Sequence, residues 1–356
     1  MTEPIVKNLA VPKASWILVT GVNGYIASHI ASQLLRLGYN VRGTVRDPFK
    51  SKWIEELYKV KYEDCKFELV QVEDATRPGA FHDAIQGISG VAHVATVFGG
   101  TPNIIDSVID MNRNLLITAA QEPTVKRFVY TSSSEAAVYS SFLEHDEMNS
   151  TLITANTWNE KAVERVRGGM LPPTPKGGFD VYAASKTLGE QATWQWVREC
   201  QPGFVVNTVL PSLCFGPSVD PKNQGHASSS GWPVAIFGNE FHKIWPFLKY
   251  IIPTGAYFVD AEDVALLHVA GLINQDVRDE RLFAFGKPFT WKEITQIFQR
   301  DFPDREFDRE PLMHPDRTGT LEIEAADRAE QLLRSMGKPG WSTLEATLKA
   351  NVADLI

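Results

Sequence analysis

Residues 16–28 read WILVTGVNGYIAS, and this stretch decides the fold class. The apolar run WILVT predicts a buried strand, and apolar residues then recur at helical spacing until Gly38. Between them lies GxxGxxA, in which Gly21 permits a sharp turn, Gly24 lets the backbone approach a pyrophosphate, and Ala27 allows close helix packing. A purely structural turn is the alternative, but the strand and helix around it favour a dinucleotide site. Cofactor contacts are predicted at Gly21, Asn23, Gly24, Tyr25 and Ile26.

The alternation of strand and helix continues along the chain. β-Branched runs at 41–45, 67–72, 91–96, 127–132 and 204–210 alternate with helical segments near 53–58, 80–85 and 103–120. Short buried strands separated by helices are typical of a parallel sheet with helices on both faces. We therefore expect an α/β protein with a Rossmann-type, doubly wound parallel sheet.

The chain is expected to divide into a core and a smaller lobe. Residues 12–212 should form the Rossmann core, and 213–356 mainly a smaller C-terminal substrate-binding lobe, with some segments returning to the core. Within this lobe, residues 228–253 are expected to be rich in loops and aromatic side chains. The lobe should lie over the carboxyl ends of the strands, where such folds bind ligands. A long segment, 140–179, precedes a helix expected to begin near Asp180. Such segments are often site-forming, although a surface excursion is the alternative.

Composition disfavours several classes of function. Of the 356 residues 44% are hydrophobic, and 43 acidic residues against 35 Lys and Arg give a net charge of -8. Without a general positive field, nucleic acid and anionic lipid are disfavoured as partners. No signal-peptide pattern and no apolar run of ~20 residues is present, so we expect a soluble, cytoplasmic protein. Cys65, Cys200 and Cys214 are widely spaced, which predicts ordinary buried thiols and no metal site.

The end of the second strand should distinguish NAD from NADP. A carboxylate there favours NAD, whereas a guanidinium meets the extra phosphate of NADP. Arg46 stands at this point and favours NADP+/NADPH, while Asp47 is expected to be an exposed turn acid. Lys50 is either a second positive charge for the phosphate or a solvated side chain. Asp74 and Ala75, after the third strand, are expected at the adenine edge.

A serine cluster and a Tyr-Lys pair are the candidate catalytic groups. One strand runs into Ser132-Ser133-Ser134, and a later helix carries Tyr182 and Lys186 on one face, four residues apart. A tyrosine with a pKa near ~10 is a poor acid-base group at neutral pH, but a nearby ammonium should lower that pKa. We predict that Tyr182 protonates a developing alkoxide while a serine hydrogen-bonds the carbonyl oxygen.

With these motifs the chain resembles the extended short-chain dehydrogenase/reductases over nearly its whole length. The segments that carry the resemblance are VTGVNGYIASHI, VRGTVRD, VAHVAT, VKRFVYTSSS, VYAASKTLGEQATW, VVNTVLPSLCFGP and GKPGWSTLEATLK. It is most similar to the branch of dihydroflavonol reductases, yeast methylglyoxal-type reductases and, above all, fungal aldehyde and carbonyl reductases. The resemblance implies NADPH-dependent reduction of an aldehyde or ketone to an alcohol.

The resemblance also implies roles for single residues. It places the active serine at Ser133, with Ser132 and Ser134 as alternatives, the phosphate-reading arginine at Arg46 and a contact to the nicotinamide ribose at Lys186. Further cofactor contacts are implied at Ala95, Thr96, Pro211 and Leu213. A largely aromatic substrate lining is implied at Val97, Phe98, Glu135, the Phe142 region, Phe179, Cys214, Phe215 and the lobe from Trp232 to Trp245, although each aromatic is alternatively core.

Other residues leave alternatives open. Glu135 either hydrogen-bonds a polar substrate group or reaches solvent. The Asn-Gly pair that the family carries before the serine strand is missing, and Asn112 is the nearest match. His93, His226 and His242 lack ligand spacing and are expected to be structural or surface residues.

Three other functions compete with carbonyl reduction. A sugar-nucleotide epimerase or dehydratase uses the same Ser, Tyr and Lys, but Arg46 argues against its NAD preference. A hydroxysteroid-type dehydrogenase remains open because the chemistry is reversible. A non-catalytic NADP-sensing regulator is disfavoured because the Tyr182/Lys186 pair is retained. The expected partner is a small, apolar or aromatic carbonyl compound, and both monomer and homodimer are open.

Overall fold

The computed structural model describes residues 6, 8–64, 66–138, 152–169, 171–252, 255–307, 321–324 and 326–356. Within these residues the main sheet has seven strands, every one parallel to its neighbours. In sheet order they are β10 (Arg281–Ala284), β7 (Val205–Pro211), β5 (Arg127–Thr131), β4 (Ile88–His93), β1 (Trp16–Thr20), β2 (Asn40–Val45) and β3 (Phe67–Gln71). The chain order reverses between β1 and β4, which is where doubly wound sheets bind ligands. The predicted Rossmann-type fold is confirmed.

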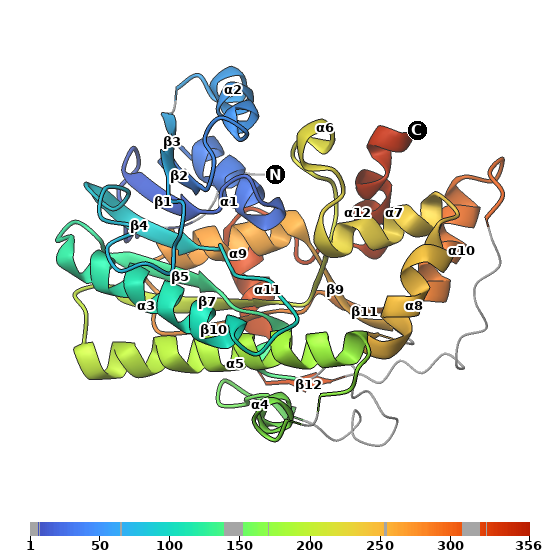
Figure 1. The fold of residues 1–356 in the computed structure, drawn as a ribbon. Helices are drawn as coiled ribbons and strands as arrows, with labels where there is room; N and C mark the ends of the chain where they lie inside the picture. The colour runs from blue at the N-terminus through green and yellow to red at the C-terminus, as the bar shows by residue number, and fades with distance from the viewer. Residues whose placement is uncertain are drawn as a thin grey trace.

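Helices cover both faces of this sheet (Figure 1). On one face lie α1 (Tyr25–Arg36), α9 (Ala261–Ile273) and α11 (Ala326–Ser335). On the other lie α3 (Ile104–Gln121) and α5 (Pro175–Cys200), the long helix that runs across the lower part of Figure 1 above α4. Neighbouring residues of one strand belong to different hydrophobic cores, one on each face of the sheet, because successive side chains of a strand point to opposite faces. Ile17 and Val19 pack with α1 and α9, whereas Leu18 packs toward α3.

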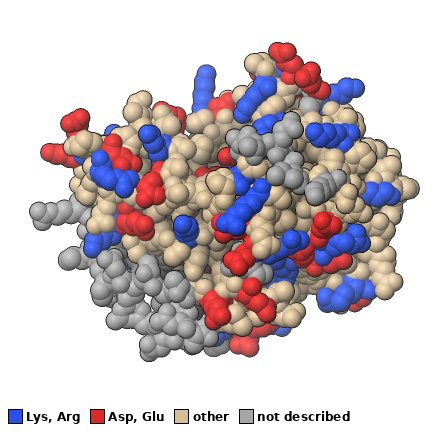
Figure 2. Space-filling view, turned by 180° about the vertical axis from the view of Figure 1, so that it is seen from behind, with Lys and Arg blue, Asp and Glu red and all other residues tan. Residues whose placement is uncertain are grey.

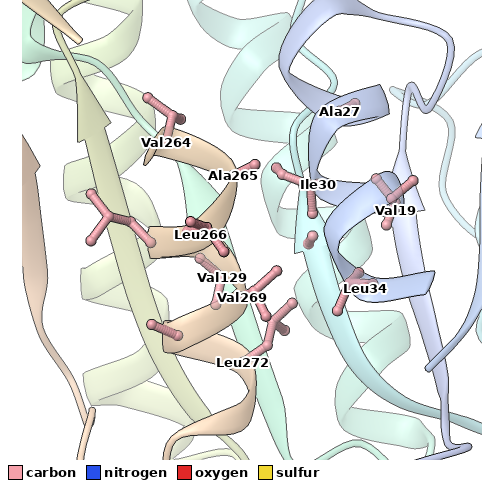
Figure 3. Packing of buried hydrophobic residues seen from close by; sticks show 14 of the residues in the cluster. Val19, Ala27, Ile30, Leu34, Val129, Val264, Ala265, Leu266, Val269 and Leu272 are labelled. Atoms are coloured by element: carbon pink, nitrogen blue, oxygen red, sulfur yellow. The ribbon is translucent and has the colours of Figure 1, made fainter. Parts of the chain in front are cut away.

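The contact between α1 and α9 stabilises the first of these cores. Figure 3 shows Ile30 and Leu34 of α1 facing Ala265 and Val269 of α9, which lies beside α1 on the same face of the sheet. All four side chains are completely buried. Truncation of one such Leu or Ile to Ala would cost about 2–5 kcal/mol, because the close packing leaves a cavity behind.

The helices of the core differ from the sequence-based expectation in two places. The expected helices after β1, around 53–58 and around 103–120 are confirmed as α1, α2 (Lys52–Lys61) and α3. The helix expected near 80–85 is wrong: residues 75–87 form turns and a bend, and the left-handed Gly79 and Gly87 interrupt helical backbone angles on both sides of this stretch. The helix expected near Asp180 begins earlier, at Pro175, whose fixed φ suits a first helical position.

A second group of elements packs around an aromatic core on the right of Figure 1. It contains β8 (Leu213–Phe215), α7 (Gly231–Phe237), α8 (Phe241–Ile251), β9 (Gly255–Asp260), β11 (Lys287–Thr290), α10 (Trp291–Asp301) and α12 (Leu344–Asn351), with the short 3-10 helices η4 (Ser228–Ser230) and η5 (Ala353–Leu355). The short helix α6 (Pro221–Gln224) follows β8 and has no buried residue. The stretch expected to be rich in loops is thus largely helical in α7 and α8. Three other elements of this half of the chain return to the core. β10 is an edge strand of the main sheet, and α9 and α11 pack on one face of that sheet.

The described part of the segment before α5 is short but structured. It holds β6 (Leu152–Ile153), which pairs with β12 (Glu322–Ile323), and α4 (Glu160–Arg167). The Phe142 region, expected near the substrate, lies outside the described residues. No helix among the described residues is long and apolar enough to cross a bilayer. On the face in Figure 2, basic and acidic side chains are interspersed over the surface.

Candidate functional site

The loop after β1 forms the tight turn that the glycine motif predicts. Gly21 has φ 64°, which favours glycine, and a Cβ there would lie 3.2 Å from the Cβ of Ala95. Gly24 is the N-cap of α1, and a Cβ on it would lie 3.1 Å from the Gly21 carbonyl oxygen. No side chain caps this end of α1 and its first turn holds no acid. Its N–H groups and positive dipole end therefore fit a pyrophosphate.

The neighbouring strand supports this turn in a way that the sequence did not reveal. A Cβ on Gly43 would lie 2.3 Å from Cγ1 of Val22, so glycine is required for the turn to sit against β2. Thr44 receives two hydrogen bonds from the turn: the Gly21 N–H donates to its Oγ1 (3.2 Å) and the Val22 N–H to its carbonyl (3.1 Å). A glycine inside a predicted strand was the available signal, because it often marks a close backbone approach.

The second group of elements reaches over the glycine turn. Tyr25 donates its hydroxyl to the Gly216 carbonyl (2.9 Å), so its side chain points away from the turn, and Ile26 is half-buried against the core. Gln224 of α6 donates to the Asn23 carbonyl (3.2 Å). The predicted cofactor contacts of Tyr25 and Ile26 would thus come from their backbone N–H groups.

Around β2 and β3 the charged groups have distinct surroundings. Arg46 is exposed directly after β2. The Asp47 carboxylate, by contrast, accepts from the backbone N–H of Lys50 (3.1 Å) and forms an ion pair with its ammonium (3.7 Å). Asp47 therefore closes its own turn, as expected of a turn acid. Asp74 accepts from the hydroxyl (2.6 Å) and N–H (3.0 Å) of Thr76, which hold the pKa of its carboxyl below the usual value. Ala75 is half-buried beside it, and adenine contacts from this pair stay a prediction.

A buried hydrogen-bond network runs from the end of β1 to α5. The Thr20 hydroxyl accepts from the N–H groups of residues 94 and 95 (both 2.9 Å), so its own proton goes to His93 Nδ1 (2.9 Å). His93 then donates through Nε2 to Asn112 Oδ1 (3.0 Å), and Asn112 Nδ2 donates to the Gly189 carbonyl (3.2 Å). Burial lowers the pKa of His93 to about 4, so the imidazole is neutral. Asn112 thus joins α3 to α5.

Ser133 and Tyr182 meet beyond the carboxyl end of β5. Tyr182 Oη donates to Ser133 Oγ at 3.4 Å, and the Glu135 N–H donates to the same oxygen at 3.2 Å. Because these bonds occupy the acceptor sites of the hydroxyl, its own proton can be donated to a substrate oxygen. Lys186 Nζ, one turn along α5, donates to the Thr131 carbonyl at 3.3 Å.

The expected lowering of the Tyr182 pKa by Lys186 is not observed. Burial raises the pKa of Tyr182 to about 12 and lowers the pKa of Lys186 to about 8, although the charge of Glu190 raises the latter. The ammonium is directed at the Thr131 carbonyl and lies 5.7 Å from the Tyr130 ring centroid. At neutral pH Tyr182 is therefore a protonated phenol, able to donate a proton, and Lys186 is largely an ammonium.

The three serines of the cluster have different neighbours. Ser132 donates its hydroxyl to Glu190 (2.7 Å) inside the core, and Ser134 is buried in η1 (Ser134–Ala136), while Ser133 contacts Tyr182. The geometry favours Ser133 over its two alternatives. Glu135 is only 5% exposed, so of the two alternatives for this residue the one in which it reaches solvent is wrong.

The expected substrate residues separate into two groups. Phe98 is 74% exposed and stacks on the Tyr182 ring, with centroids 5.9 Å apart and planes at 8°, and the Phe179 ring lies 6.0 Å from Tyr182. Cys214 is buried, and burial raises the pKa of its thiol to about 12, so the thiol is neutral. By contrast, Phe215 is completely buried in the aromatic core, where it packs against Phe258 and Phe289, and Trp232 packs against Trp291.

The remaining predicted contacts lie at the ends of strands. Ala95, Thr96 and Val97 follow β4 and are half-buried, Pro211 ends β7, and Leu213 begins β8. The structure thus brings them to the edge of the sheet that holds the glycine turn and Ser133.

Histidines and cysteines outside this edge have other surroundings. His226 lies 3.2 Å from Asp354, and His242 is exposed on α8. Cys200 is exposed, so the expectation of a buried thiol is wrong there because α5 ends at the surface; Cys214 is buried, and Cys65 lies outside the described residues. Within the described ranges no group of three or more His, Cys, Asp or Glu could hold a metal ion.

Comparison with known proteins matches residues 17–236 to the model of the NAD dependent epimerase/dehydratase family. The chain is similar to aldehyde reductase 2 of Sporidiobolus salmonicolor, with 33% identity and 97% of each chain covered. It is also similar to the ketoreductase adrE of Penicillium rubens, with 37% identity and 98% of each chain covered.

The fold matches that of a solved reductase. The crystal structure of yeast methylglyoxal/isovaleraldehyde reductase complexed with NADPH superposes with a TM-score of 0.75 at 21% identity, covering 96% of this chain and 98% of that one. Matches in sequence and in structure therefore extend over the same, nearly complete length.

Proposed function

This chain belongs to the NAD dependent epimerase/dehydratase family, and we propose that it uses NADPH to reduce an aldehyde or ketone to an alcohol. The observation that carries the proposal is the contact between Tyr182 Oη and Ser133 Oγ at 3.4 Å, at the sheet edge that also holds the glycine turn. The names of the relatives, aldehyde reductase and ketoreductase, support it.

Ser133 and Tyr182 divide the work on the carbonyl group. Ser133 donates a hydrogen bond to the carbonyl oxygen, and Tyr182, protonated because burial raises its pKa to about 12, gives its proton to that oxygen as negative charge develops. When bound, the nicotinamide supplies the hydride. Lys186 places a positive charge one turn along α5, where it holds the nicotinamide ribose and stabilises the phenolate that remains.

NADPH is bound at the edge formed by β1, β2 and β4. The N-terminus of α1 and the glycine turn take the pyrophosphate, and the exposed Arg46 pairs with the 2′-phosphate. The engagement of Asp47 with Lys50 supports this role, because the nearby carboxylate is already held in its own turn.

The substrate is a small carbonyl compound with an apolar or aromatic body. Phe98 and Phe179 flank the Tyr182 ring and offer aromatic surface beside the reacting oxygen. Glu135, buried next to Ser133, is suited to bind a polar group on the same substrate.

The competing functions find less support. An epimerase or dehydratase would share Ser133, Tyr182 and Lys186, but Arg46 favours NADP, and the two relatives above carry reductase names. A non-catalytic regulator does not need the Tyr182–Ser133 contact. A hydroxysteroid-type dehydrogenase would be the same reaction in the oxidative direction.

The first experiment follows NADPH and NADH absorbance with a panel of aromatic aldehydes, α-ketoesters and diketones. We expect several panel members to oxidise NADPH faster than NADH, with Tyr182→Phe as the blank. NADPH binding without oxidation by any member, or equal turnover in the blank, would contradict the proposal.

Three further expectations stay predictions. They are the cytoplasmic location, the choice between monomer and homodimer, and the division at residues 212/213.

A further inference from the structure

Glu190 lies one turn after Lys186 on α5 and is completely buried. Its Oε1 accepts from Arg281 Nε (2.9 Å), Thr208 Oγ1 (2.7 Å) and Trp194 Nε1 (3.2 Å). Its Oε2 accepts from Ser132 Oγ (2.7 Å) and Arg281 Nη2 (3.1 Å). A carboxylate that accepts five such bonds, two of them from one guanidinium, has one well-defined position. We call these four residues, Ser132, Glu190, Thr208 and Arg281, the Glu190 cluster.

The Glu190 cluster connects the serine turn, which carries Ser133, with helix α5, which carries Tyr182 and Lys186. Ser132 immediately precedes Ser133, and its backbone N–H also donates to the Val209 carbonyl (2.8 Å), so the residue is held from two sides. Glu190 is on the same helix as Tyr182 and Lys186. The position of the serine turn relative to α5 therefore depends on the bond between Ser132 and Glu190.

We propose that Glu190, held by Arg281, is a positioning residue for carbonyl reduction that sets Ser133 opposite Tyr182 and supplies the counter-charge for the Lys186 ammonium. The inference rests on the proposed function, because it concerns the same reaction.

Arg281 extends the cluster to the segment between Ser133 and α5. Its Nη1 donates to the carbonyls of Ala155 (2.9 Å) and Thr157 (2.8 Å), and its guanidinium carbon lies 3.8 Å from the Trp158 ring centroid. The next residue, Asn159, donates its side chain to the Glu135 carbonyl (2.8 Å). One arginine from β10 thus braces the serine turn from its far side as well.

The titratable groups around Lys186 come from several elements. They are Tyr130 on β5, His93 on β4, Tyr182 and Glu190 on α5, and, beyond Tyr182, Glu135 of η1 and Cys214 of β8. Burial raises the pKa of Tyr130, Tyr182 and Cys214 and lowers that of His93, so these four are neutral near pH 8. Glu190 is the acid whose charge raises the pKa of Lys186.

A matched pair of variants separates positioning from general stability. Ser132→Ala and Thr208→Val each remove one 2.7 Å hydrogen bond to Glu190, on different oxygens, and only Ser132 adjoins Ser133. We expect Ser132→Ala to lower kcat roughly 10- to 100-fold with unchanged NADPH affinity, because the serine hydroxyl is misplaced. Thr208→Val should lower kcat less than Ser132→Ala does, because it loosens the carboxylate but leaves Ser132 bound to Glu190. Equal effects of the two substitutions on kcat would overturn the positioning role.

The pH profile tests the counter-charge. The alkaline limb of kcat/KM should follow loss of the Lys186 proton, whose pKa is about 8. In Glu190→Gln we expect this limb about one pH unit lower, since the charge that raises the pKa is gone. Because this substitution leaves the buried Arg281 unpaired, the double variant Glu190→Gln/Arg281→Gln is measured beside it, with thermal unfolding as the check on folding.

The outcomes distinguish this inference from the proposed function. A wild-type enzyme without carbonyl-dependent NADPH oxidation would contradict the function itself. An active wild-type enzyme whose alkaline limb is unmoved in every folded Glu190 variant would overturn the inference alone.

Discussion

The glycine turn after β1 and the serine turn after β5 lie at the same edge of one sheet, yet they are built differently. The glycine turn is shaped by backbone: Gly21 at positive φ, Gly24 at the helix start and Gly43 beneath it. The serine turn is shaped by side chains that come from distant positions, above all Glu190 and Arg281.

This difference predicts which substitutions each turn tolerates. In the glycine turn, a methyl group added to a glycine would lie closer to backbone or to a buried side chain than a normal van der Waals contact allows. Even small substitutions there should therefore lower stability or NADPH affinity. In the serine turn, activity should instead be sensitive to the loss of a hydrogen-bond partner that is distant in the sequence, because each buried polar group is held by bonds to the others. The following predictions, from the largest effect to the smallest, test this contrast.

Tyr182→Phe should lower kcat about 10²- to 10⁴-fold, because the proton donor is removed while the aromatic packing against Phe98 and Phe179 is retained. NADPH affinity, measured by fluorescence titration, should remain near the wild-type value, since the glycine turn is untouched. A variant that loses NADPH binding together with turnover would show that the two turns are not separate.

The stability of the protein at acidic pH should depend on the buried hydrogen-bond network that contains His93. The folded-state pKa of His93 is about 4 and the unfolded value is about 6.5, so the unfolded chain binds more protons between these values. Stability therefore falls as pH drops through this window, by about 3 kcal/mol in total. His93→Gln should remove that share of the pH dependence of urea unfolding, whereas His242→Gln, at an exposed position, should leave it intact. Identical pH dependence in all three proteins would contradict the neutral, buried imidazole.

Gly43→Ala should displace the glycine turn, because its Cβ would meet Val22 at 2.3 Å. We expect a loss of about 1–3 kcal/mol in unfolding free energy and weaker NADPH binding. Gly203→Ala is the matched control, since a Cβ there meets no atom within 4 Å. Unaltered NADPH affinity in Gly43→Ala would mean that the turn adjusts without cost.

Arg46→Ala should weaken NADPH binding by about tenfold and leave NADH binding nearly unchanged, because a partly exposed phosphate contact is lost. Lys50→Ala should have a smaller effect, as Lys50 already pairs with Asp47. Dissociation constants for both cofactors measure the ratio, and an equal change for NADPH and NADH would remove Arg46 from the phosphate site.

The choice among the serines illustrates what sequence patterns leave open. The run Ser132-Ser133-Ser134 holds three chemically equivalent hydroxyls, and only the fold turns Ser132 toward Glu190 and Ser133 toward Tyr182. The predicted lowering of the Tyr182 pKa is wrong for the same kind of reason. The spacing of Tyr182 and Lys186 can be read from neighbouring residues, but the burial of Tyr182 and the direction of the Lys186 ammonium depend on the tertiary structure.

Local chemistry in the sequence alone determined the parallel α/β sheet, the glycine turn, the position of Arg46 and the Tyr182/Lys186 spacing, because strand and helix periods and glycine conformations are properties of neighbouring residues. Tertiary structure alone decided the burial that keeps Tyr182 protonated, the need for Gly43, the core position of Phe215 and the Glu190 cluster. These depend on contacts between residues up to 91 positions apart, as between Glu190 and Arg281, and no local pattern encodes which distant side chains meet.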